Sequence, residues 1–383
     1  MAWREITPVS ERLNMCRLAD EGIYSMSELA RSFGVSRKTC YKWLRRYRSE
    51  GEAGVFDRSR RPSCSPCSVE EEVVRQVLQM KSRYPAWGPR KLRRLLEASL
   101  GSELPCVSTV ARVLERNGLT DRREPTPRQE ALGRFERGKP NELWQADFAA
   151  PLRLANGSRL WPLPMVDDHS RYCVSLIAAP DSTSGSALSA LKLAARRYGL
   201  PTEILSDHGS AFGVSPKGLS AFTAYLWAVG VRHTQGRYAH PQTQGKIERF
   251  NQTLELECIN RHAYETLEEW NDCLEEYRQL YNQVRPHEAL GDEPPASRYL
   301  PSERRFVEPD PEYREAGEGV IHRRVDNSGR IWLLQHHIKV GKGLCGWTVS
   351  ARHDGGGVWT VLFRGHAICQ VHLAKGAAYR PKP

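Results

Sequence analysis

The chain has 383 residues, of which 40% are hydrophobic and 26% charged, and its formal net charge is +11. The composition excludes a largely disordered protein, and the length predicts two to four domains, one of them large enough for an enzyme. There is no signal-like apolar N-terminus and no run of about 18 apolar residues, so we expect a cytoplasmic protein without a membrane partner.

Positive charge is concentrated in the first part of the chain. Residues 1–140 hold 28 Lys and Arg against 18 Asp and Glu, a net +10, whereas residues 141–383 hold 28 against 27, a net +1. Because neutralising phosphates drives nucleic-acid affinity, the asymmetry favours a polyanion-binding arm joined to a nearly neutral body. A solvated basic surface is the alternative interpretation.

Residues 1–56 predict a helix-turn-helix domain of three helices, with Ser36 at the start of the third. In this third helix, RKTCYKWLRRYR, the residues Cys40, Trp43 and Leu44 have the spacing of a buried stripe. A three-helix bundle with a basic face is the alternative. The outward residues that could contact DNA in a major groove are Arg37, Lys38, Tyr41, Lys42 and Arg45.

Residues 57–68, DRSRRPSCSPCS, predict a flexible basic linker. Cys64 and Cys67 have metal-like spacing, but no second ligand pair lies nearby, and the ten Cys of the chain are scattered as reduced thiols are. We therefore interpret this pair as part of the linker rather than as a zinc site.

Residues 69–120 predict a second helix-turn-helix domain, with Ser68 and Glu71 as the cap of its first helix. A helical spacer is the alternative. The basic residues of its second helix that could contact phosphates are Arg90, Lys91, Arg93 and Arg94. The polar, Pro-bearing residues 121–140 predict a second linker.

Residues 141–300 change to strands that alternate with helices. Three apolar-rich runs, LWQADFAAPLRL, RLWPLPMVDD and YCVSLIAAP, predict consecutive antiparallel strands. The full order β-β-β-α-β-α-β-α matches a ribonuclease H-like α/β catalytic core. Beyond it, residues 318–378 predict short strands in a small β-barrel of the SH3-like kind that binds DNA or a partner subunit. The expected fold class is thus multidomain: N-terminal all-α units, a central α/β core and a C-terminal β-barrel.

Three carboxylates occupy informative places in the core. Asp147 lies in the middle of the first predicted strand, Asp207 ends the fourth, and Glu248 lies in the first turns of a helix. If the two strands are neighbours, these carboxylates meet at one sheet edge, and such hard oxygen ligands imply Mg²⁺ or Mn²⁺. Asp167 and Asp168, in DDHSR between two apolar runs, instead predict a hairpin turn.

Histidines near these carboxylates are weaker candidates. His208 and His240 are expected to orient neighbours by hydrogen bonding, with a role in proton transfer as the alternative. His336 and His337 are adjacent on a predicted strand, so they point to opposite faces and make a poor metal pair.

The motifs ADF around Asp147, SDHGSAF around Asp207 and HPQTQGKIERFNQTL around Glu248 resemble the integrase-core DDE transposases of bacterial insertion sequences. The likeness extends through VDDHSRY and YNQVRPHEALG, so it covers most of residues 140–300. Two departures are the 40 residues between Asp207 and Glu248, a longer spacing than the resemblance suggests, and His208 where Asn is more frequent. The loop GVSPKG could hold the extra length.

The resemblance implies a polynucleotidyl transferase in which Asp147, Asp207 and Glu248 hold two metal ions. Water frees a 3′-OH at the transposon end, and this hydroxyl then attacks target DNA. The expected partners are transposon-end DNA with terminal inverted repeats, target DNA and further copies of the chain in a dimer or larger assembly. Residues expected to hold phosphates are Lys246 and Arg249, with Gln244 and Asn251 as polar neighbours. A non-catalytic DNA-binding regulator and a ribonuclease H-type nuclease are the rival functions.

Overall fold

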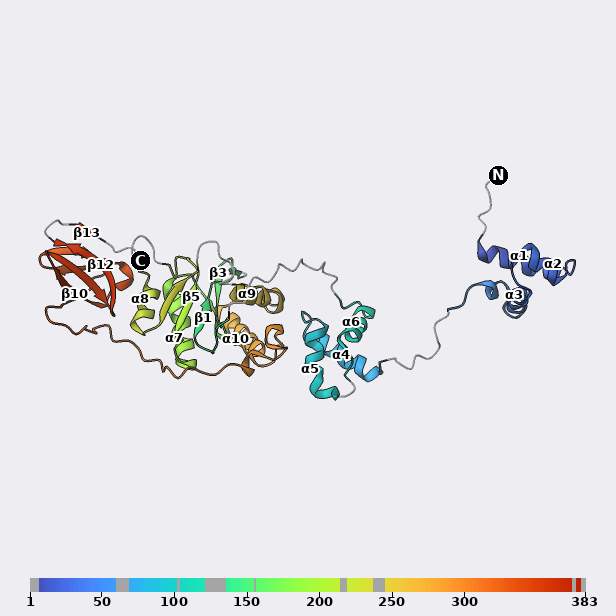
Figure 1. Cartoon of the computed structure of the whole chain (residues 1–383), viewed down its shortest axis with the longest axis horizontal. Helices are drawn as coiled ribbons and strands as arrows, with labels where there is room; N and C mark the ends of the chain where they lie inside the picture. The colour runs from blue at the N-terminus through green and yellow to red at the C-terminus, as the bar shows by residue number, and fades with distance from the viewer. Residues whose placement is uncertain are drawn as a thin grey trace. The chain divides into compact units, whose positions relative to one another are not determined.

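A computed structural model describes residues 7–59, 69–101, 104–120, 136–154, 156–213, 219–236, 245–373 and 377–379. The chain divides into two compact units, Met1–Ser68 and Val69–Pro383. Figure 1 shows helices in the first unit and both helices and sheets in the second. Among the described residues, no helix is long and apolar enough to cross a membrane.

The first unit contains, within residues 7–59, the three predicted helices and a 3-10 helix. Ser25 and Glu28 form the capping box of the second helix, and Ser36 accepts a hydrogen bond from the Thr39 N–H at the start of the third. The predicted stripe of the third helix is buried against the other two helices. The elements are α1 (Pro8–Asp20), α2 (Met26–Ser32), α3 (Arg37–Glu50) and η1 (Gly51–Val55).

Residues 69–120 form a second helical region within the larger unit. Its helices are α4 (Glu71–Arg83), α5 (Pro89–Leu100) and α6 (Val107–Arg116). Ser68 of the predicted cap lies outside the described residues, and Glu70, at the N-cap position of α4, forms no side-chain capping bond. The apolar core of this region also contacts Leu280 and Val284 of the segment that follows the sheet. Cys64 and Cys67 of the predicted first linker, and residues 121–135 of the second, lie outside the described residues.

The central region is a mixed α/β fold in which the first predicted strand is divided into two strands, β1 and β2, and the later elements follow the predicted order. Its strands are β1 (Leu143–Ala146), β2 (Leu152–Arg153), β3 (Arg159–Asp167), β4 (Cys173–Ala179), β5 (Glu203–Ser206) and β6 (Arg232–Gln235). Its helices are α7 (Ser184–Tyr198), α8 (Ala221–Ala228), α9 (Gly245–Glu257) and α10 (Leu267–Gln283), with the 3-10 helices η4 (Ile259–Arg261), η5 (Glu288–Leu290) and η6 (Pro295–Ser297).

The sheet combines antiparallel and parallel pairing. β3 pairs antiparallel with β4 and β1, whereas β5 pairs parallel with β1 and β6. Apolar residues of α7 and α8 pack on one face of the sheet, and those of α9 and α10 pack on the other. The result is a three-layer arrangement with β1 and β5 adjacent in the sheet.

The first predicted strand of this sheet is shorter than its apolar run suggested. β1 ends at Ala146, and pairing with β3 resumes at Leu152, after Pro151, which has no N–H to donate to a ladder. Asp147 therefore directly follows β1, and the prediction that it lies in mid-strand is wrong.

The C-terminal region is predominantly β-structure, as predicted. The elements are β7 (Ile321–Arg324), β8 (Arg330–Leu333), β9 (His336–Lys339), η7 (Lys342–Leu344), β10 (Thr348–Gly355), β11 (Val358–Phe363), β12 (His366–His372) and β13 (Ala377–Tyr379). Five of them form an antiparallel sheet in the order β13-β12-β11-β10-β7, and β8 pairs with β9. Among the described strands the two ends of the larger sheet do not pair with each other, so closure into the expected barrel is not observed.

Candidate active site

The strand register brings two aspartates to one edge of the sheet. Ala146 of β1 pairs with Ser206 of β5 in a parallel ladder. Asp147 and Asp207 are the residues that directly follow these two strands. Both therefore leave the sheet at the carboxyl ends of adjacent parallel strands, where such folds commonly bind ligands. The strands that precede Asp147 and Asp207 are therefore neighbours, which was the condition for the two carboxylates to meet.

The third carboxylate comes from α9. Ile247, Phe250 and Leu254 of this helix are buried against the sheet, which leaves Glu248 on the exposed side of the first turn. Asn251, one turn further on, donates a hydrogen bond of 3.4 Å from Nδ2 to Oδ2 of Asp147. This contact places α9 beside the end of β1.

The pKa of Asp147 also indicates that Asp207 and Glu248 lie near this residue. Burial, together with the nearby carboxylates of Asp207 and Glu248, raises the pKa of this carboxyl from 3.8 to about 6. In the described part of the chain, none of the three forms an ion pair with Lys or Arg. A group of mutually repelling, unpaired carboxylates is the donor set that a hard divalent cation fits.

The three carboxylates do not surround a single ion as they lie. Among the described residues, the oxygens of these three side chains do not all lie within 4.8 Å of one another. At least one of the carboxylates must therefore rotate before all three share an ion. A cavity of about 600 Å³, lined by Asp147, Glu248 and Asn251 among others, leaves space for that rotation and for a substrate.

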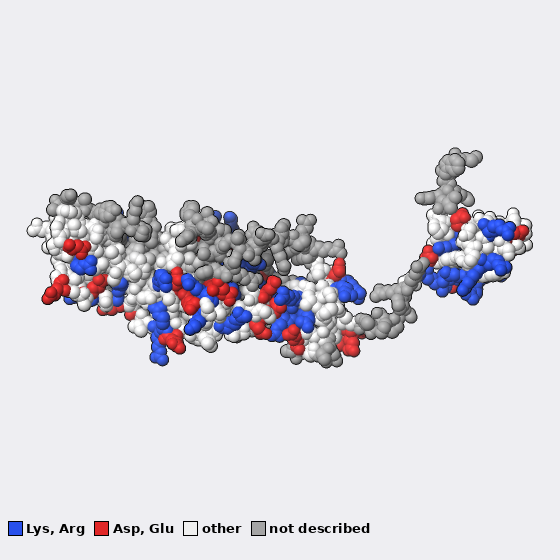
Figure 2. All heavy atoms as spheres, viewed as in Figure 1, with Lys and Arg blue, Asp and Glu red and all other residues white. Residues whose placement is uncertain are grey.

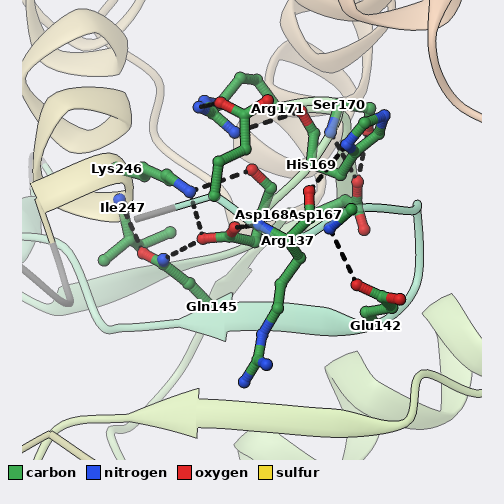
Figure 3. A network of polar contacts seen from close by, with 12 residues as sticks. Arg137, Glu142, Gln145, Asp167, Asp168, His169, Ser170, Arg171, Lys246 and Ile247 are labelled. Atoms are coloured by element: carbon green, nitrogen blue, oxygen red, sulfur yellow. Dashed lines mark hydrogen bonds and ion pairs between the residues drawn. The ribbon is translucent and has the colours of Figure 1, made fainter. Parts of the chain in front are cut away.

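A polar network anchors the start of α9 to β1 (Figure 3). Asp168 has no exposed surface and accepts bonds from Lys246 Nζ at 2.5 Å and from Gln145 Nε2 at 2.9 Å. Gln145 in turn accepts a hydrogen bond from the backbone N–H of Ile247 at 3.3 Å. Because Gln145 lies two residues before Asp147 and Ile247 precedes Glu248, this network holds two of the three carboxylates in register.

The sequence did not predict this positioning role. Asp167 and Asp168 do lie at the β3 end and in the following turn, as predicted. Asp167 accepts hydrogen bonds from Ser170 of that turn and from the backbone N–H of Asn141, which precedes β1. The overlooked signal was Gln145, a polar residue in a strand whose other residues are apolar. Lys246 does not face solvent as a phosphate ligand would, because Asp168 occupies its ammonium group.

The remaining predicted site residues divide as follows. Arg249 is exposed on α9. His208 donates to the backbone oxygen of Gly236 at 2.5 Å, which is the orienting role expected of it. His336 and His337 are both exposed on β9. His240, Gln244 and residues 214–218 of the GVSPKG loop lie outside the described residues.

The predicted DNA-contact residues of α3 are all exposed: Arg37, Lys38, Tyr41, Lys42 and Arg45. Figure 2 shows Lys and Arg side chains gathered on the visible face of this N-terminal unit. The structure thus leaves the outward face of the third helix accessible to a polyanion.

The basic residues of α5 have a different setting. Arg90 contacts Asp292 at 2.7 Å, Lys91 contacts Glu257 at 3.2 Å, and Arg94 contacts Glu293 at 2.5 Å. Arg93 pairs with Glu97 of its own helix at 3.0 Å. These four cations are therefore engaged with carboxylates, three of them in the central region, an intramolecular role that the sequence did not predict.

Family models match this chain in both its helical and its α/β regions. Two models described as integrase core domains match residues 137–241 and 229–295. A helix-turn-helix domain model matches residues 11–63, and a homeodomain-like model matches residues 39–114.

Individual proteins show the same similarity. A protein of insertion element IS476 from Xanthomonas euvesicatoria is 27% identical over 64% of this chain and 69% of its own. A protein of insertion element IS407 from Burkholderia multivorans is 29% identical over 59% of this chain and 79% of its own. Among solved structures, the HTLV-2 integrase catalytic core domain in complex with magnesium is 20% identical, covers 42% of this chain and 97% of its own, and has a TM-score of 0.32.

The integrase core defines an enzyme of the DDE transposase and integrase class. Within this class, the chain is similar to insertion-element proteins, and its integrase core follows N-terminal regions that match helix-turn-helix and homeodomain-like models.

Proposed function

We propose that this transposase cuts DNA at the ends of its own element and transfers the freed 3′-OH into target DNA. The observation that carries the proposal is the convergence of Asp147, Asp207 and Glu248, with no cation partner among the described residues, at the carboxyl ends of two parallel strands.

Asp147 and Asp207 would be the main ligands of Mg²⁺ or Mn²⁺, with Glu248 completing the site. Two such ions would activate the attacking oxygen and stabilise the leaving one. The backbone N–H of Gly209 donates to Oδ1 of Asp207 at 3.0 Å, and Asp147 accepts hydrogen bonds from Asn251 and from the Phe148 backbone, so these contacts orient both carboxylates.

The nucleophile changes between the two steps while the site stays the same. Water attacks first, and the resulting 3′-OH attacks the target phosphodiester, so neither a covalent protein intermediate nor ATP is needed. Arg249, exposed one residue after Glu248, would hold a phosphate near the reacting bond.

DNA recognition belongs to the helical regions in this proposal. The exposed cations of α3 would enter a major groove of the terminal inverted repeats. In the second region, α6 occupies the position of a recognition helix, and its Arg112 and Arg116 are exposed, whereas the cations of α5 are already paired. The α5 cations would bind phosphates only after their ion pairs with carboxylates had been broken.

We further propose that residues 1–56, 69–120, 141–300 and 318–378 act as separate domains, the last with an SH3-like fold that binds DNA or a partner subunit. Action on two element ends requires two catalytic sites, so the active form would be a dimer or larger assembly on DNA. Light scattering with and without end DNA measures this assembly.

The decisive test is the activity of carboxylate variants on labelled duplex ends with Mg²⁺ and a target plasmid. Asp147→Asn, Asp207→Asn and Glu248→Gln should each abolish cleavage and joining while DNA binding persists. Glu268→Gln is the matched control, because Glu268 is likewise an exposed glutamate in the first turn of a helix, here α10. Cleavage at the wild-type rate by any of the three variants rejects the assignment, and hydrolysis without joined product favours the nuclease alternative.

A further inference from the structure

A second group of metal-binding side chains lies beyond the carboxylates. Cys258 directly follows α9, His262 follows η4, and Cys273 lies in α10. A sulfur of each cysteine and a ring nitrogen of the histidine all lie within 4.8 Å of one another. Neither the family models nor the proposed transposition chemistry gives these residues a role.

The spacing of the two sulfurs fits a tetrahedral metal. Sγ of Cys258 and Sγ of Cys273 are 3.6 Å apart. Zinc–sulfur bonds of about 2.3 Å at tetrahedral angles place two thiolate sulfurs about 3.8 Å apart. The observed distance is far longer than the roughly 2.05 Å of a disulfide bond, so the two thiols are in contact and not bonded.

The imidazole of His262 is in the tautomer that a metal requires. Its Nδ1 lies 2.9 Å from the backbone oxygen of Cys258, which can only accept a hydrogen bond, so Nδ1 carries the proton and Nε2 keeps its lone pair. Metal-ligating histidines commonly donate their second nitrogen to a backbone carbonyl in this way. The ring is also held by stacking on Tyr264, with centroids 5.7 Å apart.

The surroundings leave room for a fourth ligand. A cavity of about 500 Å³ is lined by all three side chains and by Glu276, one helical turn after Cys273. Water or Glu276 could therefore complete a four-coordinate site.

We propose that Cys258, His262 and Cys273 bind one Zn²⁺ ion that ties the end of α9 to α10. Soft sulfur and imidazole ligands select zinc over the Mg²⁺ that the oxygen ligands of the carboxylate group select. Binding displaces the thiol protons. His262 also lines the cavity that contains Asp147 and Glu248, so the ion would stiffen one wall of the candidate active site.

The first test is the metal content of the full-length protein, purified without chelators or a metal-affinity step. Mass spectrometry of the digested sample should find one zinc per chain, and loading with Co²⁺ instead should produce a thiolate-to-cobalt charge-transfer band. A wild-type protein that neither contains zinc nor binds added Zn²⁺ or Co²⁺ overturns the proposal.

Variants locate the ion. Cys258→Ser with Cys273→Ser should remove the zinc. His262→Ala, a change at an exposed residue that spares the fold, should weaken binding by at least the roughly tenfold that loss of a ligand's hydrogen-bond partner costs. Cys369→Ser, which changes a buried cysteine of β12, is the matched control and should keep full zinc content.

A competing location is the CSPC sequence at Cys64 and Cys67. Zinc that is lost from Cys64→Ser with Cys67→Ser but retained by the Cys258 and Cys273 variant contradicts the proposal. If the site is the proposed one, a chelator should also lower the melting temperature of the wild type and leave that of the Cys258 and Cys273 variant unchanged, because a ligand bound only by the folded state stabilises it.

Discussion

Asp147 carries a charge that the folded protein accommodates poorly without a cation. The carboxyl is largely withdrawn from water, it faces two further carboxylates, and its one described side-chain donor is Asn251 at 3.4 Å. Its pKa is therefore raised from 3.8 to about 6. Between pH values of about 4 and 6, the folded state binds more protons than the unfolded state. The free energy of unfolding therefore falls as pH rises through about 6.

Asp147→Asn should therefore stabilise the metal-free protein above pH 6. The shift corresponds to a gain on the order of 1–2 kcal/mol in the free energy of unfolding after allowance for solvent screening, and this gain should disappear at about pH 4. Denaturant titration at the two pH values measures it, with the exposed Asp272→Asn of α10 as control. A variant less stable than the wild type at pH 8 would contradict the argument, and added Mg²⁺ should remove the difference by stabilising only the wild type.

Two sets of contacts hold helix α9 in position, one along its apolar face and one at its first turn. Its apolar residues pack on the sheet, and its first turn is joined to β1 through Asp168 and Gln145. Asp168 is completely buried and Lys246 is mostly so, which makes this ion pair very different from an exposed one. Because Glu248 lies in the same turn as Lys246, the orientation of the third carboxylate depends on this anchor.

Asp168→Asn should misplace Glu248 and leave Lys246 without a counter-charge. We expect a loss of about 2–4 kcal/mol in stability and a fall in the rate of strand cleavage with little change in DNA affinity. Lys246→Met added to this variant should recover part of the stability, since the unpaired buried charge is then gone. Lys192→Met, which breaks the more exposed pair with Glu308, is the control and should cost less than about 1 kcal/mol. Unaltered cleavage by a folded Asp168→Asn protein would exclude a positioning role.

The division of the chain into two compact units separates the exposed cations of α3 from the candidate active site. The unit Met1–Ser68 carries the exposed cations of α3, whereas the cations of α5 in the second unit are paired with carboxylates of the central region. Free cations contribute their full charge to phosphate binding, and paired ones must first lose their partners.

Deletion of residues 1–60 should thus weaken binding to the element's own ends far more than binding to unrelated DNA. Specific complexes typically exceed non-specific ones by about 10³-fold or more, and most of that ratio should be lost. Competition binding at a single stated salt concentration measures both affinities. An equal loss on both DNAs would show that this unit supplies only charge.

Much of this architecture follows from local patterns of residues. The capping box of Ser25 and Glu28, the Ser36 cap and the apolar spacing of α3 and α9 predicted helices that the structure contains. The alternation of elements predicted the order of the central region from β3 onward. Such features depend on residues within a few positions of one another, so they can be read from the chain directly.

Other features depend on residues that are distant in the chain. The sequence alone did not establish that β1 and β5 are adjacent, which is what brings Asp147 close to Asp207. It also did not predict that cations of α5 pair with Asp292 and Glu293. Closure of the C-terminal strands into the expected barrel likewise depends on distant residues, because it requires pairing between strands as far apart as β7 and β13.

The candidate triad shows both contributions. Residue type, motif and element assignment selected Asp147, Asp207 and Glu248, because carboxylates at strand ends and in a first helical turn are a local property of the sequence. Only folding brings these three carboxylates together at one edge of the sheet. Folding also brings Asp168 and Gln145 into the contact that links β1 to α9, and it brings Cys258, His262 and Cys273 together. Convergence of this kind results from long-range packing, and no spacing along a single chain encodes it.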